Sequence, residues 1–231
     1  MRYSFIAWLI FAAVQMGCTG MRHVTESDPM YVGSQVKFVG DKEKTKILSS
    51  RSKSVFKPKP NNKFLWMRPA VARYNMLSDS GRTKKFWKNK ITTPVLLSHT
   101  SPYQVRKAIQ NRVFNEGYFN NTVEFDTLIL GKRKAKYSYT VILNEPYRFD
   151  SVRFPVSEDV LSKEVSVASE KTLVKPDDIY SLDVVKKERT RIDHHLKESG
   201  FIFFNPEFIL MKADSTSGNF DINADFTIKP E

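Results

Sequence analysis

Cys18 is the only thiol in the chain, and the residues before it predict that this thiol is chemically modified. A positively charged start, Met1-Arg2, precedes an apolar run at residues 4–14 and the tetrapeptide Gln15-Met-Gly-Cys18. This order is typical of a secretory signal, and the run is shorter than the roughly 20 apolar residues that cross a bilayer as a helix. We expect residues 1–17 to be removed as a signal peptide, which would leave Cys18 first and available for lipidation.

Two interpretations of Cys18 stay open at this point. Gln15 occupies a position that is usually aliphatic in lipoprotein signals, and ordinary cleavage near Gly17 or Gly20 would leave an incidental thiol. A single cysteine can form no intramolecular disulfide, even in an oxidising compartment. Packed cores must therefore stabilise the protein, and 41% hydrophobic residues in a chain of 231 are sufficient for that.

The other reactive side chains predict neither catalysis nor metal binding. His194 and His195 are adjacent in a predicted helix, where neighbouring side chains point about 100° apart and cannot easily share one metal ion. Asp177-Asp178 is interpreted as the turn before that helix and not as a paired acid and base. The sequence contains no glycine-rich phosphate loop and no nucleophile elbow, so we expect no catalytic residue, no metal and no cofactor.

Positive charge is concentrated in one segment of the chain. The net charge is +12, and residues 41–100 contain 15 Lys and Arg against three acidic residues, so the rest is close to neutral. The periodicity of apolar residues also breaks down there, and we interpret residues 49–99 approximately as a basic insertion. Its candidate binding residues are Lys59, Trp66, Arg68, Phe86 and Trp87.

The insertion is predicted to face a membrane surface or a partner protein. Lysine and arginine are attracted to anionic headgroups, and tryptophan is favourable at an interface. The alternative is a solvated loop whose aromatic side chains pack on their own module. Alternating cations and aromatic rings can bind single-stranded nucleic acid, but an exported chain seldom meets it, so no nucleic acid partner is expected.

Residues 30–144, after a tether at 18–29, are predicted to form one module of order β-α-α-β-β. A strand at 31–39 and a helical turn at Ile47-Leu48 come first. A helix then begins at Ser101-Pro102 and ends at Gly117, with Val105, Ile109 and Val113 at four-residue spacing. Strands at 118–130 and 136–143 follow as a hairpin, joined by a tight turn at Gly131.

Residues 145–231 repeat this order. A strand at 147–154 leads to a short helix capped by Ser157 and a longer helix that ends at Gly200. A second hairpin follows at 201–211 and 220–228, whose last strand alternates apolar and polar residues. We therefore predict an α+β fold of two tandem modules, each with two helices on one face of a three-stranded mixed sheet.

This repeated order resembles the POTRA (polypeptide-transport-associated) modules of bacterial outer-membrane assembly factors of the BamA and TamA type. The resemblance covers nearly all of the mature chain. It is carried by the junctions Gly117-Tyr118 and Gly200-Phe201, in which a helix is followed by glycine and an aromatic residue, and by the joint at 144–149. It is closest to the lipoprotein version of the TamA-like branch, because of Tyr31-Val32, Lys59-Pro-Asn-Asn62 and the tryptophan-containing stretch at 63–87.

Members of that family hold unfolded strands and dock partner proteins, and they usually continue into a membrane β-barrel. The resemblance implies a non-enzymatic scaffold at the periplasmic face of the outer membrane. Its partners would be unfolded outer-membrane proteins or subunits of the assembly machinery. Contact with the membrane would be made by the lipid anchor and by a β-barrel that this chain does not contain.

The resemblance places the second strand of each module at a sheet edge, where an extended client can add a strand by β-augmentation. The candidate residues are Phe119, Thr122, Val123, Phe125, Phe203 and Phe208. The alternative is that the edges are protected, in the second module by Pro206 and Lys212. Two other functions stay open, a docking lipoprotein without a barrel and a cell-division or secretion adaptor, although an adaptor would retain an N-terminal transmembrane helix, which Gly17-Cys18 argues against.

Overall fold

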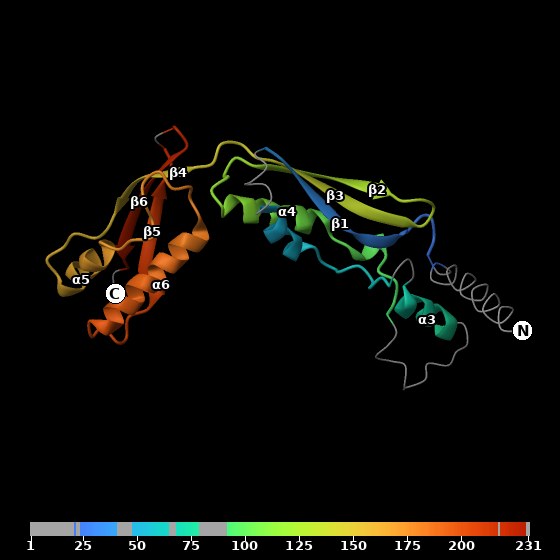
Figure 1. Ribbon diagram of the computed structural model, residues 1–231, viewed down its shortest axis with the longest axis horizontal. Coiled ribbons are helices and arrows are strands. Elements are labelled where there is room, and N and C mark those ends of the chain that lie inside the picture. Colours follow the sequence, from blue (N-terminus) through green and yellow to red (C-terminus); the bar gives the residue numbers. More distant parts are fainter. Residues whose placement is uncertain are drawn as a thin grey trace, which may run out of the picture. The chain divides into compact units, whose positions relative to one another are not determined.

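The computed structural model describes residues 21, 24–40, 48–64, 68–78, 92–216 and 218–229, and Figure 1 shows its elements. The predicted signal peptide and Cys18 lie outside the described residues. The chain divides into two compact units. The first consists of residues 1–38, 42–108 and 123–140, and the second of residues 39–41, 109–122 and 141–231. None of the helices described here is both long enough and apolar enough to span a bilayer.

The first sheet has three strands in the order β1-β3-β2, formed by Met30–Val39, Lys134–Ile142 and Thr122–Ile129. Alternate residues of β3 are buried as predicted, because Ala135, Tyr137, Tyr139 and Val141 share one face of the strand. The helix α4, Pro102–Phe114, begins at the predicted proline and buries Val105. The Tyr103 ring packs edge-on against Phe125 of β2, with ring centroids 5.1 Å apart.

Three tyrosines of β1 and β3, together with Phe125 of β2, form the centre of the first unit. The rings of Tyr31 and Tyr137 lie 6.0 Å apart, and those of Phe125 and Tyr139 lie 5.8 Å apart. Each tyrosine hydroxyl has a polar partner, since Tyr31 pairs with Ser34 at 2.7 Å, Tyr137 with Thr100 at 3.1 Å and Tyr139 with the Pro102 carbonyl at 3.4 Å. Burial of phenol rings is therefore compatible with satisfied hydroxyl groups.

The basic insertion contains a helix that the sequence pattern did not predict. Residues 48–52 are helical and continue into a 3-10 turn, Lys53–Val55, which agrees with the expected brief helix. The helix α3, Pro69–Ser78, then begins at a proline, which fits the first helical position. Val71 of α3 is fully buried and packs against Val24 and Met30. Part of the insertion therefore belongs to the packed structure of the first unit.

The second sheet has the order β4-β6-β5, formed by Arg148–Arg153, Asp221–Ile228 and Ile209–Asp214. β4 runs parallel to β6 and β5 runs antiparallel to it, so the sheet is mixed, as predicted. Ile222, Ala224 and Phe226 alternate into the core as expected. The helices α5, Val160–Ser169, and α6, Leu182–Glu198, cover this face with Val165, Val185, Ile192 and Leu196.

Three local predictions for the second unit were wrong. Asp159 and not Ser157 caps α5, because the Asp159 carboxylate accepts a hydrogen bond of 2.8 Å from the Ser162 backbone N–H. Residues 201–208 form a turn and a 3-10 turn, Pro206–Phe208, so β5 begins only at Ile209. Phe220 has a φ of 59°, which is not a strand conformation, so β6 begins at Asp221 and not at Phe220.

Candidate binding edges

The outer edge of β1 is covered at its start by a segment of its own unit. The Tyr31 N–H donates to the Val95 carbonyl at 2.8 Å, and the Leu97 N–H donates to the Pro29 carbonyl at 2.9 Å. Met30 and Leu96 also form an isolated antiparallel bridge. These bonds occupy the backbone groups to which an added strand would bind.

The outer edge of β4 is covered in the same way by residues 177–180. The Asp177 N–H donates to the Phe149 carbonyl at 2.7 Å, the Phe149 N–H donates to the Asp178 carbonyl at 3.0 Å, and the Tyr180 N–H donates to the Tyr147 carbonyl at 2.9 Å. Asp177 has a φ of 69°, a conformation that aspartate tolerates better than most residues. Asp177-Asp178 lies in the turn before α6, whose N-cap is Ser181, and its backbone covers the start of a sheet edge.

The edges of β2 and β5 differ from those of β1 and β4. In the described part of the chain, no backbone hydrogen bond is made to the outer side of either strand. In each unit the covering segment, 95–97 or 177–180, lies shortly before the longer helix, α4 or α6. It bonds to the first strand of the unit and to neither of the other two strands. In both repeats the start of the first strand is thus covered, and the outer edge of the second strand is open. An open edge is a template for an added strand.

Three predicted edge residues lie in β2. Thr122 is exposed, Val123 is buried, and Phe125 is half-buried against Tyr103. Val123 and Phe125 therefore hold the strand on its own core and leave mainly backbone groups for a client. The sequence reasoning did not single out the far end of the strand, where Leu128, Ile129 and Leu130 are all exposed.

Phe119 does not lie in the edge strand. It sits in the turn after α4, and its ring lies 4.5 Å from Phe114, 4.7 Å from Tyr147 and 5.1 Å from Tyr180, all within the second unit. Its contacts are internal to that unit. The expectation that Phe119 forms part of the edge was therefore wrong, because its side chain packs against these three rings.

Phe203 and Phe208 precede β5, so they do not belong to the edge strand as predicted. Their side chains line a groove. The groove has a volume of about 560 Å³ and is also lined by Leu161, Phe204 and Ile228. Phe203 is 96% exposed and its neighbour Ile202 is 71% exposed. An exposed apolar surface of this kind, next to the first residue of an open strand, is typical of a binding surface.

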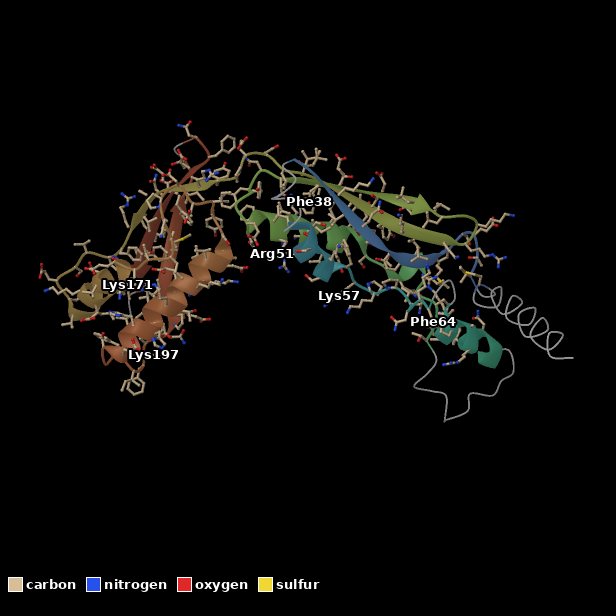
Figure 2. The ribbon with its side chains drawn as sticks, viewed as in Figure 1. Phe38, Arg51, Lys57, Phe64, Lys171 and Lys197 are labelled. Atoms are coloured by element: carbon tan, nitrogen blue, oxygen red, sulfur yellow. The ribbon has the colours of Figure 1, made fainter. Side chains whose placement is uncertain are left out.

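The structure places two of the five candidate residues of the insertion. Lys59 is exposed, and Arg68 is half-buried directly before α3, where burial lowers the pKa of its guanidinium. Trp66, Phe86 and Trp87 lie outside the described residues. Figure 2 shows Arg51, Lys57 and Phe64 along the segment before α3, and Phe64 is 64% exposed. These positions present both charge and an aromatic ring to solvent.

The adjacent histidines that are predicted not to be metal ligands lie in α6. Among the positions that the structure describes, no group of three or more His, Cys, Asp or Glu side chains could hold a metal ion. His194 is exposed and lies 3.5 Å from Glu198, and His195 lies 3.4 Å from Glu164. Both imidazoles thus have carboxylate neighbours.

The order of strands and helices defines the chain as two tandem β-α-α-β-β modules. Comparison with solved structures finds similar folds in POTRA regions. BamA POTRA domains 3–5 of Haemophilus influenzae match with 11% identity and a TM-score of 0.40, over 87% of this chain and 61% of that one. POTRA domains 1–2 of Omp85 from Anabaena match with 14% identity and a TM-score of 0.34, over 90% and 99%.

BamA of Haemophilus ducreyi lacking POTRA domains 1–3 is also similar, with 14% identity and a TM-score of 0.37 over 65% of this chain and 28% of that one. This chain therefore spans less than two thirds of the length of both BamA structures. No protein-family model matches the chain, and no curated protein is similar to it in sequence. These solved structures contain POTRA domains, the modules that the sequence resembles, while the TamA-like lipoprotein branch stays a prediction.

Proposed function

We propose that this protein is a non-enzymatic periplasmic scaffold that holds extended strands of unfolded outer-membrane proteins by β-augmentation. The observation that carries the proposal is the difference between sheet edges. Residues 95–97 and 177–180 cover the starts of β1 and β4 with backbone hydrogen bonds, and no described residue makes such a bond to the outer side of β2 or β5. Each repeat therefore covers the start of one sheet edge and leaves the other edge, that of β2 or β5, available to another chain.

β2 is the stronger of the two open edges. It is eight residues long, whereas β5 has six, follows Pro206 and carries the charges of Lys212 and Asp214. Proline and lysine at an edge disfavour strand pairing. The exposed Leu128 and Ile129 add apolar area beside the backbone groups of β2. Backbone pairing requires no particular client sequence, which suits the binding of many different strands.

A single backbone N–H on β2 provides a direct test. The Leu130 N–H donates to the Lys134 carbonyl at 2.7 Å, so in a regular strand the N–H groups of alternate residues, Thr127 among them, face the open side. Thr127 is exposed. Thr127→Pro removes that donor, and an edge strand tolerates proline at such a position. Thr127→Ala removes a similar amount of side chain and keeps the donor.

The probe is a synthetic peptide of about ten residues with alternating valine and threonine, the length of a transmembrane β-strand. Binding to the full chain is followed by nuclear magnetic resonance of the backbone amides. We expect signals of residues 122–129 to shift, and Thr127→Pro to weaken the affinity by about tenfold or more, close to the loss of one buried hydrogen bond. Thr127→Ala should change it by less than about twofold.

Equal binding by both variants, with unchanged thermal stability, would exclude the β2 edge as the binding site. Ala213→Pro provides the same test for β5, because the Lys229 N–H donates to the Phe208 carbonyl at 2.8 Å and fixes the alternation of that strand. If only Ala213→Pro weakens binding, the scaffold uses its second open edge. If neither does, the proposed mode of client binding is wrong.

We further propose that Cys18 is lipidated and anchors the scaffold at the periplasmic face of the outer membrane. The support is the order of charged start, apolar run and Gly17-Cys18 in the sequence. Mass spectrometry of the protein extracted from membranes tests this directly. A mature N-terminus at Cys18 with an added diacylglycerol and acyl chain is expected, and an unmodified thiol after cleavage at Gly20 would contradict it.

A further inference from the structure

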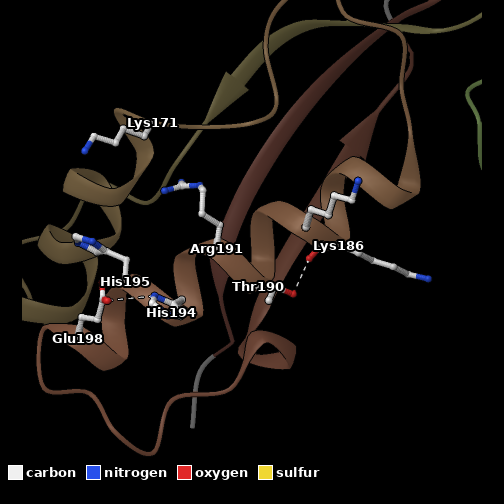
Figure 3. Close-up of a pocket in the computed structure, with 8 residues that line it drawn as sticks. Lys171, Lys186, Thr190, Arg191, His194, His195 and Glu198 are labelled. Atoms are coloured by element: carbon white, nitrogen blue, oxygen red, sulfur yellow. Dashed lines mark hydrogen bonds and ion pairs between the residues drawn. The ribbon is translucent and has the colours of Figure 1, made fainter.

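A cleft lined mainly by basic residues lies between the end of α5 and the exposed side of α6. It has a volume of about 660 Å³, within the usual range of ligand sites. Lys171 borders it from the α5 side, and Lys186 and Arg191 border it from α6 (Figure 3). Lys187 of α6 also lines the cleft. All four belong to the second unit. The methylene groups of these side chains form apolar walls, and their charged ends give the cleft a positive electrostatic potential.

Arg191 is held in place by a buried carboxylate. Its Nε donates to Glu188 Oε2 at 2.9 Å and its Nη2 to Glu188 Oε1 at 2.7 Å, while Glu188 is fully buried and also accepts the Leu173 N–H at 2.9 Å. Arg191 Nη2 also donates to the Ala168 carbonyl near the end of α5, at 2.8 Å. These bonds use Nε and Nη2. They leave Nη1 on a side chain that is 24% exposed and fixed in orientation.

The lysines that line the same cleft are not neutralised by carboxylates. Among the residues with described side chains, Lys171, Lys186 and Lys187 form no ion pair, whereas Lys163 and Lys197 pair with Glu158 and Asp193 at 2.9 Å each. Glu198 and Glu164 lie at the other end of the cleft, 3.5 Å from His194 and 3.4 Å from His195. The lysine end of the cleft therefore has an excess of positive charge.

We propose that this cleft binds a phosphate group, with Arg191 Nη1 as the fixed donor and Lys171 and Lys187 as mobile cations that close on it. A phosphate offers several acceptor oxygens and up to two negative charges, which suits one planar guanidinium and more than one ammonium. The carbonyl ends of α5 would oppose an anion, but the bond from Arg191 to Ala168 offsets that effect. The phosphate belongs either to a lipid headgroup or to a soluble molecule.

The test compares two double charge reversals in the full chain. Lys171→Glu/Lys187→Glu changes the cleft, and Lys175→Glu/Lys212→Glu makes the same change in net charge at exposed lysines of the same unit that do not line it. Inorganic phosphate and glycerol 3-phosphate are titrated while backbone amide signals are followed. We expect saturable shifts confined to residues near 168–171 and 187–195. The cleft variant should weaken binding by about tenfold or more and the control by less than about twofold.

A second arm identifies the source of the phosphate. Vesicles of phosphatidylglycerol are compared with vesicles of phosphatidylcholine for wild type and both variants. A soluble source is indicated by saturable binding of glycerol 3-phosphate with no difference between variants on vesicles. A lipid source is indicated by loss of phosphatidylglycerol binding in the cleft variant alone. Equal weakening by both double variants, shifts spread over all lysines, or equal competition by a glutamate hexapeptide would overturn the proposal, since each indicates a general attraction of anions.

Discussion

A Cβ atom added to Gly117 would lie 2.7 Å from the carbonyl oxygen of Tyr180. Gly117 has a φ of 90°, and its own carbonyl accepts the Tyr147 N–H at 2.8 Å. The Leu182 N–H donates to the Asn115 carbonyl at 2.8 Å, so this turn and the start of α6 hold each other by backbone bonds within the second unit. Gly200 occupies the equivalent position in the repeat, with a φ of 99°, but no atom lies within 4 Å of its added Cβ.

The two glycines therefore predict different costs for the same substitution. Gly200→Ala should lower the free energy of unfolding by about 1 kcal/mol, the cost of a left-handed conformation for a residue with a Cβ. Gly117→Ala adds a backbone clash and should cost at least about 3 kcal/mol. Urea unfolding of the second unit measures both. Equal costs would mean that the contact between Gly117 and Tyr180 contributes nothing beyond the glycine conformation.

The sequence predicted those parts of the fold that depend on neighbours along the chain. The alternation of β3 and β6, the start of α4 at Pro102 and the turn at Gly131, with a φ of 71°, all follow from local patterns and were found. The starts of β2 and β5 were wrong by several residues. Phe119 and Phe203 suit a strand by propensity, but contacts far along the chain decide their place. Phe119 lies among three other rings, and Phe203 is left in a turn.

The candidate edges could be predicted only in part for the same reason. The resemblance to POTRA modules predicted that the second strand of each module lies at a sheet edge, and β2 and β5 are indeed edge strands. Which edges are closed depends on residues 95–97 and 177–180, whose backbone groups pair with strands about 30 to 65 residues earlier. No local sequence pattern indicates that residues 95–97 or 177–180 form backbone hydrogen bonds with an edge strand. The positive φ of Asp177 is its only special feature, and aspartate is common in ordinary turns as well.

The N-cap of α5 predicts a specific dependence of stability on acid. Hydrogen bonds from the hydroxyl groups of Ser157 and Ser162, and from the Ser162 N–H, lower the pKa of Asp159 to about 2. A carboxyl whose pKa is lower in the folded state contributes stability above its unfolded pKa, near 4, and loses it as the pH falls toward the folded value. Asp159→Ser keeps a capping oxygen without the charge. Its stability relative to wild type should therefore improve between about pH 4 and about pH 2.

Thermal unfolding of wild type, Asp159→Ser and Asp159→Ala over this pH range checks the prediction. The alanine variant should be less stable at neutral pH because it loses the cap, and it should share the weaker acid dependence of the serine variant. Glu158→Gln is the control, since the Glu158 side chain is 99% exposed and should leave the acid dependence unchanged. Parallel curves for all four proteins would mean that another carboxylate controls the acid limb.

The tyrosine cluster of the first unit predicts a loss of stability in alkali. Burial raises the pKa of Tyr139, and the neighbouring Tyr31 and Tyr137 raise it further. A phenol with a raised folded pKa contributes stability below its unfolded value, near 10, and this stability is lost as the pH rises above that value. Tyr139→Phe removes the group. Its curve of stability against pH should therefore fall less steeply above about pH 10 than that of wild type.

Tyr103→Phe is the matched control for this change, because the Tyr103 side chain is 69% exposed. It should leave the alkaline limb as in wild type. Titration of phenolate absorbance in the ultraviolet gives an independent measurement, since Tyr139→Phe should remove a late-ionising phenol. At neutral pH, Tyr139→Phe costs at most about 1 kcal/mol, because its bond to the Pro102 carbonyl is long, at 3.4 Å. A normal ionisation of every phenol in the folded protein would contradict the prediction.

The pair formed by Glu188 and Arg191 predicts a large effect of removing one charge and a small effect of removing both. Glu188→Gln leaves a half-buried guanidinium opposite a buried amide that also donates hydrogen bonds, and it should lower the free energy of unfolding by about 3 kcal/mol. Glu188→Met/Arg191→Met replaces the pair with apolar side chains of similar length and should recover most of that loss. Glu158→Gln removes the charge from an exposed pair with Lys163 and should have no measurable effect.

The double variant also separates stability from ligand binding. Because it is folded but lacks the Arg191 guanidinium, it should retain the thermal transition of the second unit and lose phosphate binding at the cleft. Urea unfolding and phosphate titration of the same samples measure the two effects. If Glu188→Gln is as stable as Glu158→Gln, the buried carboxylate does not hold Arg191 in place. In that case the guanidinium would be as mobile as the lysines around it, and a site with a fixed donor would not exist.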